Sequence, residues 1–549
     1  MRNTVKGKKL RVRAIAGSHV VLLGWSMRQS DTADLLGFAI ERTEFKGTQV
    51  VEKYFLRGIK RFAEKDAGVG PGTPLPTSEH PVQSFQWGDY TPRPGVNYRY
   101  RIVPAKGTPK KLLLQDAAAV EVDIRTEPEV GPTHEIYFNR GVAGSQAYAR
   151  KFPNPHPEPN DPDSAQMRWL SRGLFEALVA FIGEARGAGF GLRAALYEFH
   201  YEPVGQAVRA AVDNGADVRV LYDTPNYKED NEAMIRALGL MSVCKPRGAG
   251  GAQKHNKFIV LTRSGQPVAV WTGSTNISAG GIFGHSNVGH VVRDAVVAAR
   301  YLALWDSLAT DPTPAKLAPI NEAATPVPAT LPAHGATTLL FSPRAGSTLD
   351  WYSKLMSQAR GMVCFTVAFS LAKTFETVLA KPSGVLRYVL ADKSLNKGEP
   401  ISRDKNLVVA SGAKFEAGDL ANFLAERLTG LNSNYYIHTK FMLLDPLGKV
   451  PTVVTGSANF SPASQTSNDE NMLVIRGDTR VADIYFGEFM RIFDHLYARY
   501  LARKIREAAT ASGVAASGQG GYLHSDDKWV AAHFGSGPKS LRRAYYVGD

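Results

Sequence analysis

The chain contains one short pattern of polar residues on an apolar segment twice. The first copy reads His255-Asn-Lys-Phe-Ile-Val-Leu-Thr262, and the second reads His438-Thr-Lys-Phe-Met-Leu-Leu-Asp445. A Gly-Ser-x-Asn turn follows each copy, and Asn276 and Asn459 both lie 21 residues after their histidine. A single copy is a common combination, whereas matching residue types at matching offsets indicate an internal duplication. The chain is therefore predicted to contain two related structural units.

The duplication extends beyond these motifs. Asn287 and Glu470 also stand at equal offsets, 32 residues after their histidines. The apolar segment 218–222 of the first unit is matched by 385–390 in the second. Strand-like segments alternate with helical periodicity, as in 169–184, and this alternation is typical of layered α/β folds. We therefore expect two copies of an α/β unit.

The first 128 residues have a different pattern, which predicts β structure. Segments 20–25, 37–42 and 97–103 are rich in β-branched and aromatic residues and are bounded by Gly, Pro and Asp. The segments that begin at Gly37 and Gly95 resemble the fibronectin type III pattern, which implies a small all-β sandwich that positions other domains. No reactive cluster of side chains is visible in this part of the sequence, so we expect an accessory domain.

Changes in composition mark the other boundaries. Residues 311–336 are rich in Pro and Ala, which predicts a semi-rigid linker or an extended strap. Residues 508–521 are rich in Ala, Ser and Gly and are predicted to be flexible. The aromatic residues that predict a docked C-terminal strap are Trp529, Phe534, Tyr545 and Tyr546. The expected domains are a β-sandwich at 1–128, lobe 1 at 129–310, the linker at 311–336, lobe 2 at 337–505, and a flexible segment with the strap at 506–549.

The spacing inside each motif brings its charged side chains together. On a strand, residues i and i+2 share a face, so His255 and Lys257 point the same way, and so do His438 and Lys440. One imidazole can attack phosphorus to form a phosphohistidine, and the second can protonate the leaving oxygen and then deprotonate water or an alcohol. The predicted catalytic residues are His255, Lys257, Asn276, His438, Lys440, Asn459 and Glu470, and the predicted substrate-binding residues are Ser274, Ser457 and Asn287. This chemistry needs no metal or other cofactor, and the sequence has no His-x-x-x-His pair and no ligand spacing of cysteines.

These motifs resemble the signature of the phospholipase D superfamily, His-x-Lys-x-x-x-x-Asp followed by Gly-Ser-x-x-Asn or a close relative. The resemblance covers residues 130–505 and implies two pseudo-symmetric α/β/α sandwich lobes with a phosphohistidine mechanism. Thr262 stands where the first copy should have Asp, whereas Asp445 keeps it in the second. Because this position lies five residues after the motif lysine, we expect Asp445 to be structural and its absence from the first copy to leave activity intact. The alternative is an inactive first half.

The two supporting residues differ, which suggests different roles for the histidines. The resemblance suggests that each supporting residue reaches the histidine of the opposite lobe. A carboxylate makes an imidazole more basic and fixes its tautomer, whereas an amide only orients it. Glu470 would then support His255, which makes His255 the nucleophile and His438 the general acid. If the supporting residues, Asn287 included, stay within their own lobes, these roles are exchanged.

Other residues near the expected site are weaker candidates for substrate contact, and each is explained at least as well as a core or rim residue. They are Tyr197, Glu198 and His200 in the first lobe and Phe369 and Ser370 in the second. We interpret His285 and His290, which flank Asn287, as loop or structural histidines.

The formal net charge is +14, from 65 Lys and Arg against 51 Asp and Glu. It fits an ordinary solvated basic surface and an anionic partner, such as nucleic acid or an anionic lipid surface, equally well. Cys244 and Cys364 lie among apolar residues, which predicts buried thiols. We find no signal-peptide core and no apolar run that could span a bilayer. We therefore expect a soluble protein of the cytoplasm, or one exported without a conventional signal peptide, and a monomer because both lobes lie in one chain.

Two substrate classes fit such an enzyme. The first is a phospholipid at a membrane surface, whose phosphodiester would be hydrolysed or transferred to another alcohol. The second is nucleic acid, cleaved by a nuclease of the same fold, and the positive charge would attract its phosphates. Length favours the lipid, because a minimal nuclease of this type can be a single lobe that dimerises. A non-catalytic binding module is the third and least favoured interpretation.

Overall fold

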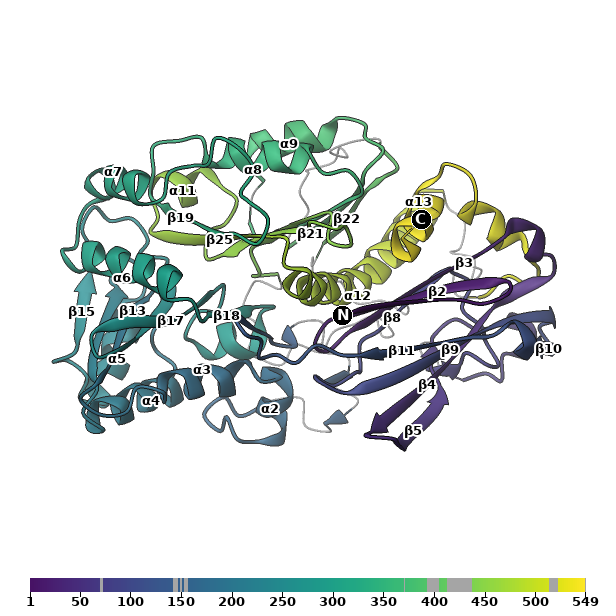
Figure 1. Cartoon of the computed structure of the whole chain (residues 1–549), viewed down its shortest axis with the longest axis horizontal. Helices are drawn as coiled ribbons and strands as arrows, with labels where there is room; N and C mark the ends of the chain where they lie inside the picture. The colour runs from purple at the N-terminus through teal and green to yellow at the C-terminus, as the bar shows by residue number, and fades with distance from the viewer. Residues whose placement is uncertain are drawn as a thin grey trace.

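A computed structural model of the chain describes residues 1–69, 73–141, 147–148, 151–152, 157–369, 371–392, 404–411, 437–512 and 522–548, with side chains described throughout except at 498–512. Within these residues a β-sandwich lies beside two α/β units, and one long helix runs between the three bodies (Figure 1). The sandwich is formed by the N-terminal part of the chain, as the β-rich pattern predicts.

The sandwich consists of two antiparallel sheets that share one core. The first sheet contains, in spatial order, β1 (Arg2–Lys6), β2 (Leu10–Ala16), β3 (Val21–Met27) and β8 (Gln86–Asp89). The second contains β10 (Lys111–Leu114), β9 (Asn97–Thr108), β4 (Leu35–Lys46) and β5 (Gln49–Phe55), with β11 (Val120–Arg125) also paired to β9. Trp25, Phe38 and Tyr100 are buried between them. Along β11 the side chains alternate between buried and exposed, as expected for a strand with one face on a core.

The first α/β unit is built on a seven-stranded sheet. Its strands, in spatial order, are β12 (His134–Phe138), β18 (Val288–Val292), β17 (Gln266–Gly273), β16 (Lys257–Arg263), β13 (Phe190–Leu196), β14 (Asp217–Asp223) and β15 (Cys244–Arg247). The pairs β13–β14 and β14–β15 are parallel, and the other neighbours are antiparallel. Most of these strands are buried along nearly their whole length, which is why they read as apolar runs rather than alternating patterns.

The second α/β unit repeats this arrangement strand for strand. Its order is β19 (Thr337–Ser342), β25 (Glu470–Arg476), β24 (Thr452–Gly456), β23 (Phe441–Leu444), β20 (Met362–Val367), β21 (Leu386–Ala391) and β22 (Leu407–Ser411). The parallel pairs, β20–β21 and β21–β22, fall at the same places as in the first sheet. The duplicated sequence therefore has a duplicated topology in which β16 and β23, the motif strands, are equivalent.

Helices cover the outer faces of both sheets, and one helix from each unit lies between them. The outer helices are α2 (Ala165–Ser171), α3 (Leu174–Ile182), α4 (Glu202–Asp213) and α5 (Lys228–Ala237) in the first unit and α8 (Thr348–Ser357), α9 (Lys373–Ala380) and α11 (Pro462–Thr466) in the second. The inner helices are α6 (Ala295–Ala309) and α12 (Thr479–Ser512). Asp294 caps α6 by accepting from two backbone N–H groups. Val260, Tyr301, Phe341 and Phe489 belong to one buried cluster, so the two sheets share a central core.

Three expectations about elements are corrected. The periodic segment 169–184 is not one helix, because Arg172 and Gly173 both have positive φ and separate α2 from α3. The segment 311–336 is not an extended linker throughout, because α7 (Pro314–Ala324) occupies its first half. Proline is tolerated in the first turn of a helix, and Leu317 anchors this one in the central core.

The predicted flexible segment 508–521 is also corrected in part. Helix α12 continues to Ser512, so the first five residues of the segment are helical, and 513–521 lie outside the described residues. Ala is the strongest helix former, which explains the extension. None of the described helices combines the length and the apolar character needed to cross a bilayer.

The C-terminal residues pack against two different bodies. The last helix, α13 (Pro538–Val547), follows a short 3₁₀ helix at Lys528–His533. Trp529 is buried in the core of the β-sandwich and donates its indole N–H to the carbonyl of Leu35. Tyr546 belongs to the central core between the α/β units. The end of the chain therefore ties the sandwich to the second α/β unit.

Candidate active site

The two motif histidines lie at equivalent places in the two sheets. His255 lies two residues before β16, and His438 lies three residues before β23. The prediction that each histidine shares a strand with its lysine is therefore wrong, because both histidines precede the strands. Both are almost completely buried, with exposed fractions of 4% and 5%. Since the sheets share one core and have the same strand order, the equivalent strand ends meet, and both histidines line one cavity.

Each histidine is supported from the opposite unit. The Nδ1 atom of His255 lies 2.9 Å from both carboxylate oxygens of Glu470, the first residue of β25. The Nδ1 atom of His438 lies 2.9 Å from the amide oxygen of Asn287. Both acceptors are oxygens, so Nδ1 donates in each histidine and Nε2 is the remaining ring nitrogen. The sequence left open whether each supporting residue contacts the histidine of its own unit or of the opposite unit. In the structure each contacts the histidine of the opposite unit.

The motif lysines are held beside the histidines of their own motifs. Lys257 Nζ donates to the carbonyl oxygen of His255 at 2.6 Å, and Lys440 Nζ donates to that of His438 at the same distance. The ring of Tyr197 lies 4.9 Å from Lys257 Nζ, a cation–π distance. The predicted grouping of one imidazole with one ammonium is therefore present twice.

The turn serines contact the supporting residues rather than the cavity. Ser457 Oγ donates to Glu470 at 2.6 Å, and Ser274 Oγ donates to Asn287 at 2.8 Å. The amide nitrogen of Asn287 donates to the carbonyl of Gly281, so both ends of the side chain are hydrogen-bonded. Ser274, Ser457 and Asn287 are absent from the described lining of the cavity, and their binding of substrate stays a prediction. Their hydrogen bonds are those of residues that position the two histidines.

The cavity has a volume of about 650 Å³, which is the usual size for a small-molecule site. The turn asparagines, Asn276 and Asn459, line it as expected. Within the described part of the chain, neither of their buried amide oxygens has a hydrogen-bond partner. The amide nitrogen of Asn276 donates to Glu198. The weaker candidates that also line the cavity are Tyr197, Glu198, His200, His285 and Phe369, whereas Ser370 lies outside the described residues.

One side of the cavity is acidic, which the sequence analysis missed. Glu202, the first residue of α4, and Asp230, in α5, line it together with Glu198. Tyr227 packs edge-on against Tyr197, with ring centroids 4.9 Å apart. No motif marks these residues. The one available signal is their place just after β13 and β14, because ligands in open α/β sheets bind at the carboxyl ends of strands.

The histidines on either side of Asn287 have different surroundings. The ring of His285 lies 5.7 Å from that of His438 and lines the cavity, so His285 is closer to the chemistry than expected. His290 is fully buried in the core, where it hydrogen-bonds to Tyr485 and His134. Its interpretation as a structural histidine agrees with these contacts.

Polar contacts next to the site join the two units. Asn471 accepts from Thr272 Oγ1 at 2.6 Å and from the hydroxyl of Tyr301 at 2.8 Å. Its amide nitrogen donates to the side chain of Asn256 at 2.7 Å. Because Asn471 directly follows Glu470, this buried network fixes the strand end that carries the carboxylate.

Burial lowers the pKa of the two motif histidines and the two motif lysines. The pKa of His255 falls to about 4 because of burial, which outweighs the opposing charge of Glu470. The pKa of Lys257 falls to about 8, also mainly because of burial. Burial and the neighbouring ammonium of Lys257 lower the pKa of Lys440, and burial and Lys440 lower that of His438. A negative charge placed among these four groups would therefore stabilise the charged form of each one.

The motif aspartate faces away from this space. The carboxylate of Asp445 accepts from the backbone N–H groups of Arg360, Gly361 and Met362 at 2.6 to 3.1 Å. It therefore anchors the loop before β20. Thr262 holds the corresponding place in β16, where it is buried. Among the described residues, no group of three or more His, Cys, Asp and Glu side chains is arranged to hold a metal ion.

A known family model matches one part of the chain, which contains one of the two motif copies. Residues 401–496 match the family model described as "Cardiolipin synthase, PLD-like domain". This match includes the second motif and supports the phospholipase D superfamily for this part of the chain. No curated protein matches the sequence.

Several solved structures are similar at low identity. Polyphosphate kinase from Porphyromonas gingivalis is 16% identical over 55% of this chain and 43% of its own, with a TM-score of 0.38. Phosphatidylserine synthase from Haemophilus influenzae Rd KW20 is 13% identical over 59% of this chain and 85% of its own, with a TM-score of 0.41. A phospholipase D family member, Nuc from Salmonella typhimurium, is 20% identical over 29% of this chain and 95% of its own, with a TM-score of 0.22. This chain thus spans less than half the length of the polyphosphate kinase.

Proposed function

We propose that this protein is a phosphodiesterase of the phospholipase D superfamily that works through a covalent phosphohistidine. The observation that supports this proposal is the pairing of His255 and His438 in one cavity, each with its Nδ1 held from the opposite unit. Two lysines lie beside them, and burial lowers the pKa of all four groups. A phosphodiester supplies the negative charge that this arrangement lacks.

The first step is attack on phosphorus by Nε2 of His255. Its Nδ1–H donates to Glu470, so the positive charge that develops on the ring is stabilised by a carboxylate. A P–N bond forms and the bond from phosphorus to the leaving oxygen breaks. His438, charged in the presence of the substrate anion, donates its proton to that oxygen. Lys257 and Lys440 stabilise the charge on the non-bridging oxygens.

The second step reverses the direction of proton transfer. His438, now neutral, removes a proton from water or from an acceptor alcohol, whose oxygen attacks phosphorus and breaks the P–N bond. Water gives hydrolysis, and an alcohol gives transfer of the phosphatidyl group. His255 returns to its neutral form, and His438 returns to its protonated form, ready for the next substrate.

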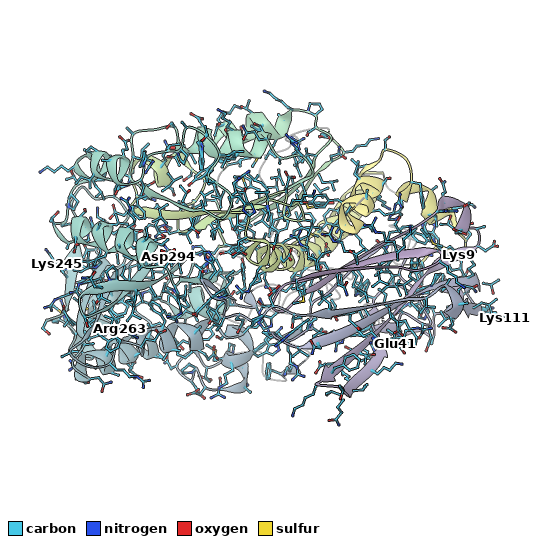
Figure 2. The ribbon with its side chains drawn as sticks, in the orientation of Figure 1. Lys9, Glu41, Lys111, Lys245, Arg263 and Asp294 are labelled. Atoms are coloured by element: carbon cyan, nitrogen blue, oxygen red, sulfur yellow. The ribbon has the colours of Figure 1, made fainter. Side chains whose placement is uncertain are left out.

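The acidic side of the cavity supports a phospholipid over a nucleic acid. Glu198, Glu202 and Asp230 line the cavity, and among its described lining residues there is no Lys or Arg; the two motif lysines lie behind the histidines. These carboxylates would repel the phosphates that flank a scissile bond in a polynucleotide, whereas they suit a headgroup with a positive charge. The labelled basic side chains Lys111 and Lys245 lie at opposite ends of the molecule (Figure 2).

A substrate panel tests the function and the choice of substrate together. We expect the wild-type protein to release headgroups from phosphatidylcholine vesicles in EDTA, and His255→Ala and His438→Ala to abolish the release. Glu202→Gln combined with Asp230→Asn should lower kcat/KM for the choline headgroup relative to the glycerol headgroup. Cleavage of single- or double-stranded DNA in EDTA, with no headgroup release, would replace the lipid proposal with the nuclease alternative, in which the net positive charge attracts the phosphates of the polynucleotide.

A further inference from the structure

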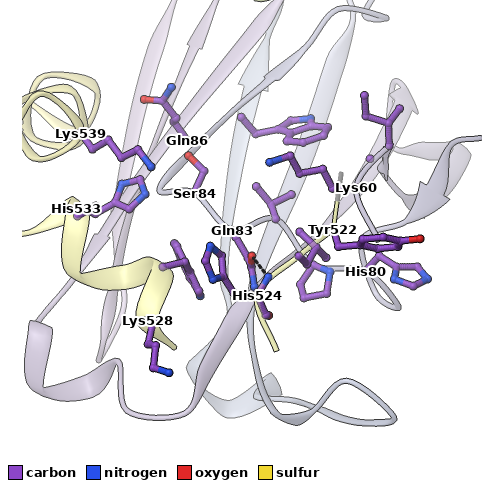
Figure 3. A pocket seen from close by; sticks show the side chains of 18 residues that line it. Lys60, His80, Gln83, Ser84, Gln86, Tyr522, His524, Lys528, His533 and Lys539 are labelled. Carbon is purple, nitrogen blue, oxygen red and sulfur yellow. Dashed lines mark hydrogen bonds between the residues drawn. The ribbon is translucent and has the colours of Figure 1, made fainter. Parts of the chain in front are cut away.

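A second pocket lies between the β-sandwich and the C-terminal segment, and it shares no residue with the cavity of the histidines. Its volume is about 700 Å³. Residues 58–60 and 80–87 of the sandwich form one side, and residues from 522 to 539 form the other (Figure 3). The two sides are joined by Gln83, whose amide pairs with the backbone of His524 through two hydrogen bonds of 2.8 and 2.9 Å.

The charged residues of this pocket all have the same sign. Its described lining contains three lysines and three histidines and no Asp or Glu; they are Lys60, Lys528, Lys539, His80, His524 and His533. Lys528 has an ion pair with Asp526, which lies outside the pocket lining, whereas Lys60 and Lys539 have no ion pair within the described part of the chain. Restricted hydration and the charge of Lys539 both lower the pKa of Lys60, so the two ammonium groups act on the same space.

Histidine side chains in the pocket supply hydrogen-bond donors. His80 is only 5% exposed, and its Nδ1 accepts the backbone N–H of Phe62 at 3.1 Å. Its Nε2 therefore carries the hydrogen and is available as a donor. His533 is also buried, and burial together with Lys539 lowers its pKa to about 4. Both rings are therefore neutral at pH 7, so the charge of the pocket comes from its lysines.

The rest of the lining is largely apolar. It consists of Ile59, Pro81, Val82, Trp87, Leu523, Trp529 and Ala532, with Tyr522 beside them. Ile59 is 49% exposed, an unusual position for an isoleucine unless another surface covers it. A ligand for this pocket therefore needs an apolar body as well as a negative charge.

We propose that this pocket binds a phosphomonoester with an apolar body, the chemistry shared by a lipid phosphate and a nucleoside monophosphate. A phosphomonoester carries a charge of about −1.5 to −2 at pH 7, which matches two lysines that have no counter-ion better than a carboxylate or a phosphodiester does. Lysine binds phosphate as a point charge, and His80 adds a directed donor. The ligand would hold the C-terminal segment to the sandwich. This proposal does not rest on the proposed function of the histidine site.

Calorimetry on the full chain with five probes tests the proposal. The probes are dihexanoyl phosphatidic acid, dihexanoyl phosphatidylcholine, AMP, hexanoate and inorganic phosphate. We expect binding of phosphatidic acid or AMP, with phosphatidylcholine and hexanoate at least about tenfold weaker, because they lack the second negative charge or the phosphate. Inorganic phosphate should bind more weakly than the better ester because it has no apolar body. Tighter binding of phosphatidic acid would identify the ligand as a lipid phosphate, and tighter binding of AMP would identify it as a nucleoside monophosphate.

Exposed residues allow variants that leave the fold intact. Lys60→Gln with Lys539→Gln should weaken ester binding about tenfold or more, and Ile59→Ser should weaken it about fivefold while leaving inorganic phosphate unaffected. The matched control is Lys46→Gln with Lys111→Gln, two exposed lysines of the same sandwich outside this pocket. No binding of either ester, or equal losses in the test and control pairs, would overturn the proposal.

Discussion

The Nδ1 atom of His255 lies 2.9 Å from both carboxylate oxygens of Glu470, a residue 215 positions later in the chain. The equivalent contact of His438 is to the amide of Asn287. One histidine therefore has a charged partner and the other a neutral one, although the surrounding sheets have the same strand order. This difference is the physical basis for giving the two histidines unequal roles.

Glu470→Gln should lower kcat/KM by about 10- to 100-fold, the usual effect of losing a partner that orients and polarises a catalytic side chain. The amide can still accept from His255, so the loss measures the negative charge rather than the hydrogen bond. Steady-state kinetics on a soluble phosphodiester provide the measurement. Asn287→Ala is the matched variant at the other histidine, and a larger loss there than in Glu470→Gln would contradict the assignment.

His438→Asn should accumulate label on His255 when the protein is mixed with a substrate that is labelled at phosphorus and carries a good leaving group, such as p-nitrophenolate, because departure of this group does not need the general acid. Without His438 the water or alcohol is not deprotonated, so the P–N bond persists. Digestion and mass spectrometry locate the modified peptide. A phosphorylated His438 in the converse variant, His255→Asn, together with an unlabelled His255 in the first, would reverse the roles.

Loss of the His438 proton should already lower kcat/KM as the pH rises, and the profile should fall more steeply above about pH 8. The pKa of Lys257 is lowered to about 8, so the side chain is charged below that pH and neutral above it. The neutral amine cannot stabilise phosphate oxygens, and kcat/KM reports groups of the free protein. Lys257→Arg remains charged, so its alkaline limb should move upward even if its maximum is lower. An unchanged limb would show that another group titrates there.

Stability should decline as the pH falls from about 6.5 toward 4. Burial lowers the pKa values of His255, His285 and His533 to about 4, so the unfolded chain binds protons first over this interval. The contribution of each such histidine to the free energy of unfolding is complete above about pH 6.5, the pKa of the unfolded chain. It declines by at most about 1.4 kcal/mol per pH unit between that pKa and the lower pKa of the folded protein. Urea unfolding at pH 7.5, 5.5 and 4.5 measures it. His533→Gln should have a shallower dependence than the wild type, and an identical slope would count against this cause.

Asp445→Ala should destabilise the protein by about 1–3 kcal/mol, because three backbone N–H groups lose their acceptor. Thr262→Ala, at the equivalent place in the first unit, should cost less than about 1 kcal/mol. Neither change should alter the activity per folded molecule, since the carboxylate faces a loop rather than the cavity. Loss of activity in Asp445→Ala with no loss of stability would assign this residue to the chemistry instead.

Local pattern predicted much of the fold. The apolar segment 218–222 lies in strand β14, and 386–390 of the segment 385–390 lies in strand β21. The failures are at positions where backbone conformation or packing overrides composition. Arg172 and Gly173 interrupt a helical periodicity, and the Pro/Ala-rich segment after 311 is partly helical because Leu317 can be buried against the central core.

Residue type and short-range periodicity are enough to predict the duplicated motifs, the apolar strands that follow their histidines, and the identity of the paired histidines and lysines. The partner of each polar side chain, in contrast, depends on the packing of the two units against each other. The tertiary structure directs Ser274 and Ser457 to the supporting residues, places Glu202 and Asp230 in the cavity, and joins Glu470 to His255. Such contacts depend on how two sheets pack across a shared core. No local sequence pattern encodes the distance between side chains on different sheets.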